Sequence, residues 1–189
     1  NLMLMIISPS KTLDYKNPPS TKSFSVPNHL EKSAELISIM KNQTYPELMN
    51  LMDVSRKIAE LNLERFQKWE MPFNFENSKQ AVLAFKGDVY NGMNSINLEK
   101  EELDYAQEHL RIISGLYGLL RPLDLIQPYR LEMGVKLKTD KGSDLYHFWG
   151  EEITKAVNSI LSEQIEPVLV NLASNEYFKV IQHRNLSGV

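Results

Sequence analysis

The hydrophobic positions of this chain form two kinds of run, and each kind predicts a different element. Short unbroken apolar runs are typical of strands buried on both faces. They occur at residues 2–7, 81–85, 112–114 and 167–172. Apolar residues three and four positions apart predict amphipathic helices at residues 28–40, 54–69, 99–110 and 151–161, the first of them capped by Asn28. This order predicts a mixed α/β fold, a single domain over residues 1–189 with helices on both sides of a buried mixed sheet.

Three of the predicted strands end in clusters of polar residues. The clusters are Ser8, Ser10, Lys11 and Thr12; Lys86 and Asp88; and Ser174, Asn175 and Glu176. Because ligands of open α/β sheets bind beyond the carboxyl ends of the strands, we expect the clusters to converge in one pocket. The lysines and hydroxyls suit a phosphate or carboxylate, while Asp88 and Glu176 suit a cation or acid–base chemistry. The alternative is that these residues are only the polar ends of strands.

The segment 112–122 contains two glycines three positions apart between apolar runs. Such spacing permits a tight turn between two helices, in which the backbone N–H groups of Gly115 and Gly118 face a phosphate. Basic residues follow the turn, and they are Arg121, Arg130, Lys136 and Lys138. The alternative is a plain glycine-rich turn in which Arg121 pairs with Asp124 and Arg130 with Glu132. The spacing leaves both interpretations open.

Composition and charge narrow the classes of protein. A chain of 189 residues is the length of one domain. It has no cysteine, which excludes a disulfide framework, a thiolate nucleophile and Cys-ligated zinc or iron–sulfur, and fits a reducing, cytoplasmic compartment. The net charge of -3 provides no global attraction for nucleic acid, so any such site must be local.

Motifs of the common nucleotide and metal enzymes are missing. The sequence has neither G-x-x-x-x-G-K-[ST] nor a G-x-G-x-x-G after a strand. Its histidines, at positions 29, 109, 147 and 183, show no H-x-x-x-H or H-E-x-x-H spacing. The sequence therefore predicts no metal site and no cofactor, and it gives little support to a Ser-His-Asp triad.

A set of collinear motifs carries a family resemblance. They are SPSKTLD at 8–14, FKGDVY at 85–90, SGLYG at 114–118, LRPLD at 120–124, QPYRLEMG at 127–134, FWG at 148–150, NLAS at 171–174 and EYFK at 176–179. From Met3 to about Lys179 the chain resembles the YaaA family of bacterial peroxide-stress proteins. The resemblance implies a cytoplasmic protein with a mixed α/β fold, a helix-hairpin-helix element and a positively charged cleft that binds duplex DNA, and a role in limiting damage by peroxide and free iron. Family members extend several dozen residues further, so it also implies a chain that lacks a C-terminal part.

The resulting hypothesis is a DNA-binding protein of the peroxide stress response. The residues expected at phosphates are Ser8, Ser10, Lys11, Lys86, Arg121 and Arg130 by their side chains, and Gly115 and Gly118 by their backbone amides. A rival hypothesis is an enzyme acting on a nucleotide, nucleobase or nucleic acid, with Asp88 and Glu176 as acid, base or cation ligands. A third is a binding protein for iron or another small ligand, which the lack of a histidine–carboxylate cluster weakens. The expected partners are duplex DNA and a small anionic or nucleobase ligand, and no membrane.

Overall fold

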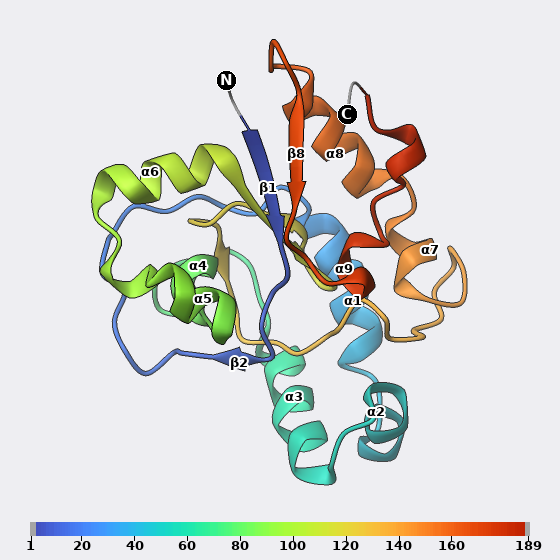
Figure 1. The fold of residues 1–189 in the computed structure, drawn as a ribbon. Helices are drawn as coiled ribbons and strands as arrows, with labels where there is room; N and C mark the ends of the chain where they lie inside the picture. The colour runs from blue at the N-terminus through green and yellow to red at the C-terminus, as the bar shows by residue number, and fades with distance from the viewer. Residues whose placement is uncertain (1–2, 188–189) are drawn as a thin grey trace.

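A computed structural model describes residues 3–187 of the chain. The centre of the molecule is a four-stranded sheet (Figure 1). Its order is β6-β5-β1-β8, formed by β1 (Met3–Ile7), β5 (Leu110–Ser114), β6 (Gly118–Leu120) and β8 (Val168–Asn171). Strand β1 pairs in parallel with both β5 and β8, whereas β6 runs antiparallel to β5. The carboxyl ends of β1 and β8 therefore lie side by side, as the strand-end clusters predicted.

Two small antiparallel pairs of strands lie outside this sheet. Strand β2 (Thr12–Leu13) pairs with β4 (Phe85–Lys86), and β3 (Lys79–Gln80) pairs with β7 (Leu125–Ile126). The first pair brings the loop after β1 against the segment around Lys86. Residues far apart in the sequence thus become neighbours close to the end of β1.

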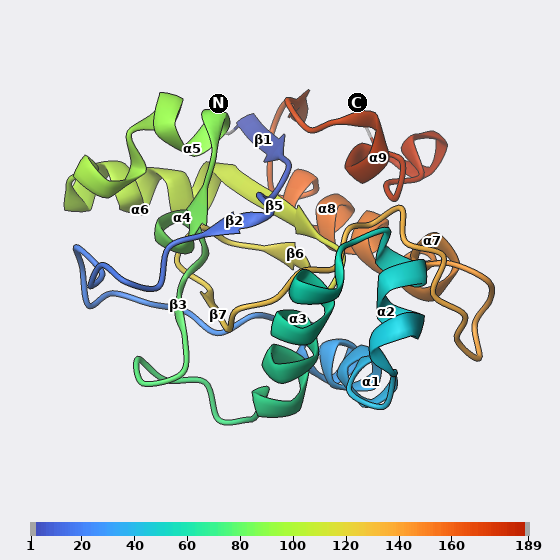
Figure 2. The ribbon, with the colours of Figure 1, turned by 90° about the horizontal axis from the view of Figure 1, so that it is seen from below.

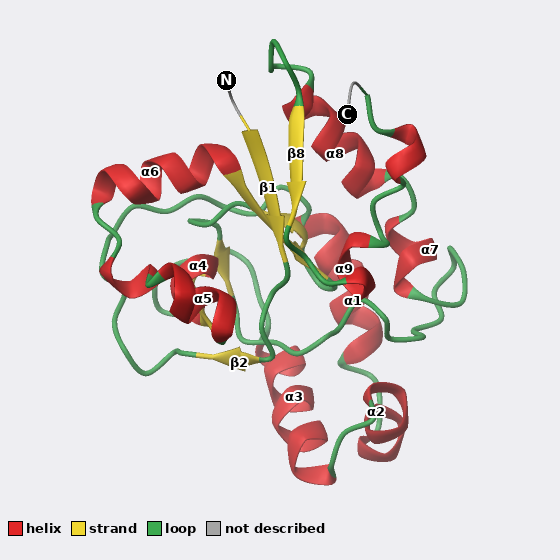
Figure 3. Ribbon diagram, viewed as in Figure 1, coloured by secondary structure: helices red, strands yellow, loops and turns green. Residues whose placement is uncertain are grey.

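Helices surround the sheet, and loops link them into the rest of the fold (Figure 3). Their bounds are α1 (Leu30–Met40), α2 (Tyr45–Met52), α3 (Arg56–Lys68), α4 (Ala81–Ala84), α5 (Asp88–Met93), α6 (Lys100–His109), α7 (Leu145–Trp149), α8 (Glu152–Leu161) and α9 (Asn175–Phe178), with 3-10 turns at Ser95–Asn97 and His183–Asn185. Both ribbon views place α4, α5 and α6 on one side of the sheet and α7, α8 and α9 on the other (Figures 1 and 2). Helices α2 and α3 lie at the end of the molecule toward which β1 runs.

Helices α2 and α3 are consecutive and pack against each other, and local sequence sets their ends. Thr44 and Glu47 form a reciprocal capping box at the start of α2. Asp53 ends α2 in the left-handed conformation with φ 51°, and Ser55 then caps α3 by accepting a hydrogen bond from the N–H of Ile58. The helices are therefore joined by a turn of only three residues, 53–55.

The core is built where the sheet meets its helices. Leu4 and Ile6 of β1 and Ile112 of β5 are fully buried, as are the aromatic side chains of Tyr117 and Trp149. The predicted helices are confirmed as α1, α3, α6 and α8, and the predicted strands at the start, middle and end of the chain as β1, β5 and β8. Position 2, where the first strand was predicted to begin, lies outside the described residues. Between residues 3 and 187, no helix has the length and hydrophobicity needed to cross a membrane.

Four sequence predictions are wrong in detail. Asn28 does not cap the first helix, because α1 begins after His29 and no side chain caps it. Residues 81–84 form the buried helix α4 rather than a strand, because a short apolar run fits either element and its position in the core selects one. Strand β8 is half exposed, since it lies at the edge of the sheet. Gly115 and Gly118 lie in the β-hairpin between β5 and β6 and are buried, so they do not join two helices.

Candidate functional site

The ends of β1 and β8 are tied together by their serines. The backbone N–H of Ser174 donates to the Oγ of Ser8 at 2.8 Å, and the N–H of Leu172 donates to the carbonyl of Ile6 at 2.8 Å. The Tyr90 hydroxyl donates to the carbonyl of Ser8 at 2.8 Å and fixes this loop from the other side. Two of the three predicted polar clusters therefore meet, and Ser8 acts by holding them together.

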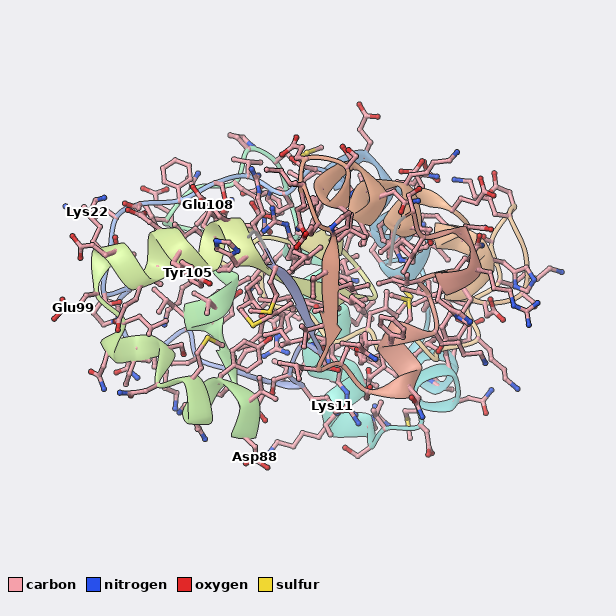
Figure 4. The ribbon with its side chains drawn as sticks, turned by 45° about the horizontal axis from the view of Figure 1, so that its top comes forward. Lys11, Lys22, Asp88, Glu99, Tyr105 and Glu108 are labelled. Atoms are coloured by element: carbon pink, nitrogen blue, oxygen red, sulfur yellow. The ribbon has the colours of Figure 1, made fainter. Side chains whose placement is uncertain are left out.

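The third cluster approaches the same loop through the small sheet of β2 and β4. Thr12 pairs with Lys86, and the hydroxyl of Ser10 donates to the Lys86 carbonyl. The Lys86 side chain, however, lines a separate pocket of about 260 Å³ with Asp14 and Tyr90. Asp88 is exposed at the start of α5, and Figure 4 shows it at the outer edge of the molecule, to one side of Lys11. Lys86 and Asp88 are thus close in the fold to Ser10 but do not share a cleft with Lys11.

A cleft of about 520 Å³ lies beside Lys11 and joins several parts of the chain. One wall is the end of α2 and its turn, residues 50–53. The opposite wall is the segment 132–136 with Glu176 of α9. The cleft thus lies between the helical pair α2–α3 and the polar end of the sheet. We call it the Lys11 cleft.

Glu132 is the best-held charged group of the Lys11 cleft. Its Oε1 accepts a hydrogen bond from Nε of Arg130 at 3.1 Å, and Nη2 of the same guanidinium lies 3.1 Å away as an ion-pair contact. Lys11 Nζ lies 3.5 Å from the same oxygen. The Glu132 side chain is only 13% exposed, and its Oε2 is buried without a hydrogen-bond partner among residues 3–187. A buried carboxylate oxygen without a partner can still accept a hydrogen bond.

Glu176 packs against the backbone of Gly134, within the same wall of the Lys11 cleft. A Cβ at Gly134 would stand 3.3 Å from the Glu176 Cδ, so this contact is close because residue 134 is glycine. The Tyr146 hydroxyl donates to the Glu176 carbonyl at 2.6 Å, and Lys179 Nζ lies 5.0 Å from the centre of the Tyr146 ring. Burial and then the negative charge of Glu176 raise the pKa of Tyr146, so that hydroxyl stays a neutral donor.

The segment 131–138 presents its charges by strict alternation. Leu131, Met133, Val135 and Leu137 are buried, whereas Gly134, Lys136 and Lys138 between and after them are exposed and Glu132 is mostly covered. Lys136 and Lys138 are therefore exposed on one face of this extended segment. Lys136 lines the Lys11 cleft, so two lysines border it, against the acidic residues Asp53, Glu132 and Glu176.

Arg121, Gly115 and Gly118 do not belong to this site. Arg121 Nε donates to Asp124 Oδ1 at 3.0 Å, and its Nη2 donates to the Val26 carbonyl at 2.7 Å. The ion-pair interpretation of Arg121 is thus confirmed, as is that of Arg130 with Glu132. A Cβ at Gly115 would stand 2.2 Å from a backbone carbonyl oxygen, and one at Gly118 would stand 2.8 Å from the Trp149 ring. These glycines allow close packing and cannot expose their amides to a phosphate.

The chemistry of the Lys11 cleft is that of a mixed-charge binding site. Among residues 3–187, no group of three or more histidine and carboxylate side chains could hold a metal ion. Sequence reasoning named Lys11 and Glu176 but missed the wall at residues 50–53 and treated Glu132 only as an ion-pair partner. The capping signal Thr44-x-x-Glu47 would have revealed α2 and hence that wall. No local signal identifies Glu132, because its environment is assembled from distant segments.

Comparison with known proteins gives two results. A family model described as "Peroxide stress protein YaaA" matches residues 3–189. A protein of Shewanella loihica named UPF0246 protein is 53% identical to this chain over 186 residues. The matched region covers 98% of this chain and 72% of the Shewanella protein.

Proposed function

The chain belongs to the family of the peroxide stress protein YaaA, and within the peroxide response we propose that it binds DNA at the Lys11 cleft. The observation that carries this proposal is that exposed lysines lie across a cleft from the turn between helices α2 and α3. Lys11, whose side chain is 64% exposed, and Lys136 border the cleft, and the α2–α3 turn forms its other wall. Phosphates attract such lysines because binding releases counterions from the nucleic acid.

The helical pair α2–α3 supports the same function. In this proposal the pair takes the part of the helix-hairpin-helix element that the family resemblance implied, in place of the glycine segment 112–122. Helix α3 begins with Arg56 and Lys57 and has no acidic residue in its first turn. Ser55 satisfies the N–H of Ile58, and the remaining N–H groups and the positive end of the dipole at this helix start favour phosphate. A duplex lying along this end of the molecule would contact the start of α3 and the lysines of the cleft together.

Several residues first assigned to phosphate serve to position Lys11 instead. Ser8 bonds Ser174, and Ser10 bonds Lys86 and the N–H of Thr12 at 3.1 Å. These contacts hold both ends of the loop that carries Lys11. The proposed phosphate contacts are therefore Lys11, Lys136 and the start of α3, with Lys138 and Lys86 on the flanks.

Fluorescence anisotropy of a labelled duplex tests the proposal. We expect binding at about 50 mM salt and a steep loss by about 200 mM, with a log–log slope of about -0.9 per phosphate contact. Lys11→Ala and Lys136→Ala should each weaken binding and reduce the slope by about one contact. Lys100→Ala is the matched control, since this α6 side chain is 73% exposed and lies away from the cleft.

Two outcomes contradict the proposal. One is the absence of duplex binding at low salt. The other is an equal loss of affinity in Lys11→Ala and Lys100→Ala, which would show attraction to surface charge without a site. The rival enzyme with Asp88 and Glu176 as a pair has no geometric support, because Asp88 does not line the cleft that Glu176 borders.

A further inference from the structure

We propose that the Lys11 cleft receives a single unpaired nucleobase, with Glu132 as the acceptor of its N–H edge and guanine as the preferred base. The proposal rests on the DNA-binding function above and names the part of the nucleic acid that enters the cleft. It follows from the charges of the cleft, the hydrogen bonding of Glu132 and the apolar residues beside them.

The charges of the Lys11 cleft exclude a phosphate from its interior. Lys11 and Lys136 are countered there by Asp53, Glu132 and Glu176. A phosphate placed among three carboxylates is repelled, whereas an uncharged group that donates hydrogen bonds is attracted. The lysines therefore suit the flanking phosphates at the rim, and the carboxylates suit a base edge within.

The Glu132 carboxylate can accept more hydrogen bonds than it accepts in this structure. Arg130 orients the carboxylate by one hydrogen bond and one ion-pair contact to Oε1, and Oε2 has no hydrogen-bond partner among the described residues. The contact with Lys11 is the loose one, at 3.5 Å from a largely exposed side chain. When Lys11 moves to a phosphate, the N–H donors of a base take its place at Glu132.

Two adjacent donors satisfy a carboxylate better than one. Guanine presents N1–H and N2–H side by side, which matches the two oxygens of Glu132 when the departure of the Lys11 side chain uncovers the buried Oε2. Adenine and cytosine present one exocyclic amine on that edge, and thymine one ring N–H. Base-edge pairs of this bidentate kind discriminate by about tenfold or more. The preference for guanine follows from this geometry.

The cleft also offers apolar surface for the base. Leu51, Met52 and Val135 line it beside the charged groups. A base removed from its stack loses contacts that apolar side chains partly replace. The volume of about 520 Å³ lies within the range of sites for small organic ligands. Charge, hydrogen bonding and apolar surface thus point to the same occupant.

Anisotropy titrations of five labelled duplexes test the inference. One duplex is perfect, and four carry a single bulged nucleotide, G, A, C or T, in the same flanking sequence. We expect the G bulge to bind about tenfold more tightly than the perfect duplex and more tightly than the other bulges. Free GMP should displace the G-bulge duplex at concentrations where AMP and CMP do not, which needs no variant protein.

Glu132→Gln keeps the size of the side chain but replaces one acceptor oxygen by a donor amide. In this variant the G-bulge duplex and the perfect duplex should bind with nearly equal affinity. Glu151→Gln is the matched control, because Glu151 is exposed and pairs with Lys155 outside the cleft. That variant should keep the wild-type ratio.

Each contrary outcome is distinct. If the perfect duplex and all four bulges bind equally, the inference is wrong while DNA binding stands. If Glu132→Gln keeps the wild-type preference, the assignment of Glu132 is wrong. If no duplex of any kind binds at low salt, both the inference and the proposed function are wrong.

Discussion

Replacement of Arg130 by alanine tests whether this residue acts through Glu132 or directly on a phosphate. The guanidinium donates one hydrogen bond from Nε to Glu132 Oε1 and places Nη2 beside the same oxygen, each at 3.1 Å, and the side chains are 20% and 13% exposed. Hydrogen bonds to charged groups contribute about 1.5–3 kcal/mol, and breaking a fully buried pair costs about 3–5 kcal/mol. Because this pair is partly exposed and Lys11 remains near Glu132, we expect Arg130→Ala to lower the free energy of unfolding by about 2 kcal/mol.

Urea denaturation of a double-mutant cycle measures this effect. The cycle compares the parent with Arg130→Ala, Glu132→Gln and the double variant, each extrapolated to zero urea. The losses of unfolding free energy in the two single variants should add up to about 1–2 kcal/mol more than the loss in the double variant. The reason is that the second replacement neutralises the charge that the first left unpaired. A loss below about 0.5 kcal/mol for Arg130→Ala, with additive effects in the cycle, would refute the reasoning and return Arg130 to the phosphate contacts.

Three further predictions concern the surroundings of the cleft. Hydrogen bonds from Asn17, first its side chain and then its backbone, lower the pKa of Asp14 to about 2 from 3.8, so this stabilisation is complete above about pH 4 and lost as the pH falls toward 2. Asp14→Asn should therefore cost about 1–2 kcal/mol in urea denaturation at pH 7 after allowance for solvent screening, with the difference from the parent vanishing near pH 2; a difference that persists there would contradict it. Gly118→Ala should destabilise the protein by about 2–5 kcal/mol by thermal or urea unfolding, because φ is +75° and the new Cβ meets the Trp149 ring; a stable variant with weakened DNA binding would restore the phosphate role of that glycine. Asp88→Asn should leave duplex affinity in anisotropy titrations equal or slightly higher, since this exposed residue lies outside the cleft, and a clear loss of affinity would place it in the site.

The sequence alone determined the elements whose signal is local. The periodic apolar residues of α6 and α8 fix which face each helix buries, and this requires only the 3.6-residue repeat. The apolar runs of β1 and β5 likewise predicted central strands. The collinear motifs also identified the family, because each motif is read directly along the chain.

Tertiary structure decided the elements for which the local signal was ambiguous. The run at residues 81–84 has no period long enough to separate helix from strand, and its buried position made it α4. The glycines at 115 and 118 suited several kinds of turn. They form a buried β-hairpin, in which Leu131 packs closely on Gly115 and Trp149 on Gly118.

The candidate site itself depended on contacts between distant residues. The sequence predicted that Ser8 and Ser174 would meet, since parallel neighbouring strands end at one edge of a sheet. It did not show that Glu132 would meet Lys11, because the segment 131–138 that carries Glu132 belongs to no regular helix or strand and its path is set by packing. Local sequence determines backbone periodicity and the burial of each face, whereas the neighbours of a charged side chain depend on how separate segments pack in three dimensions.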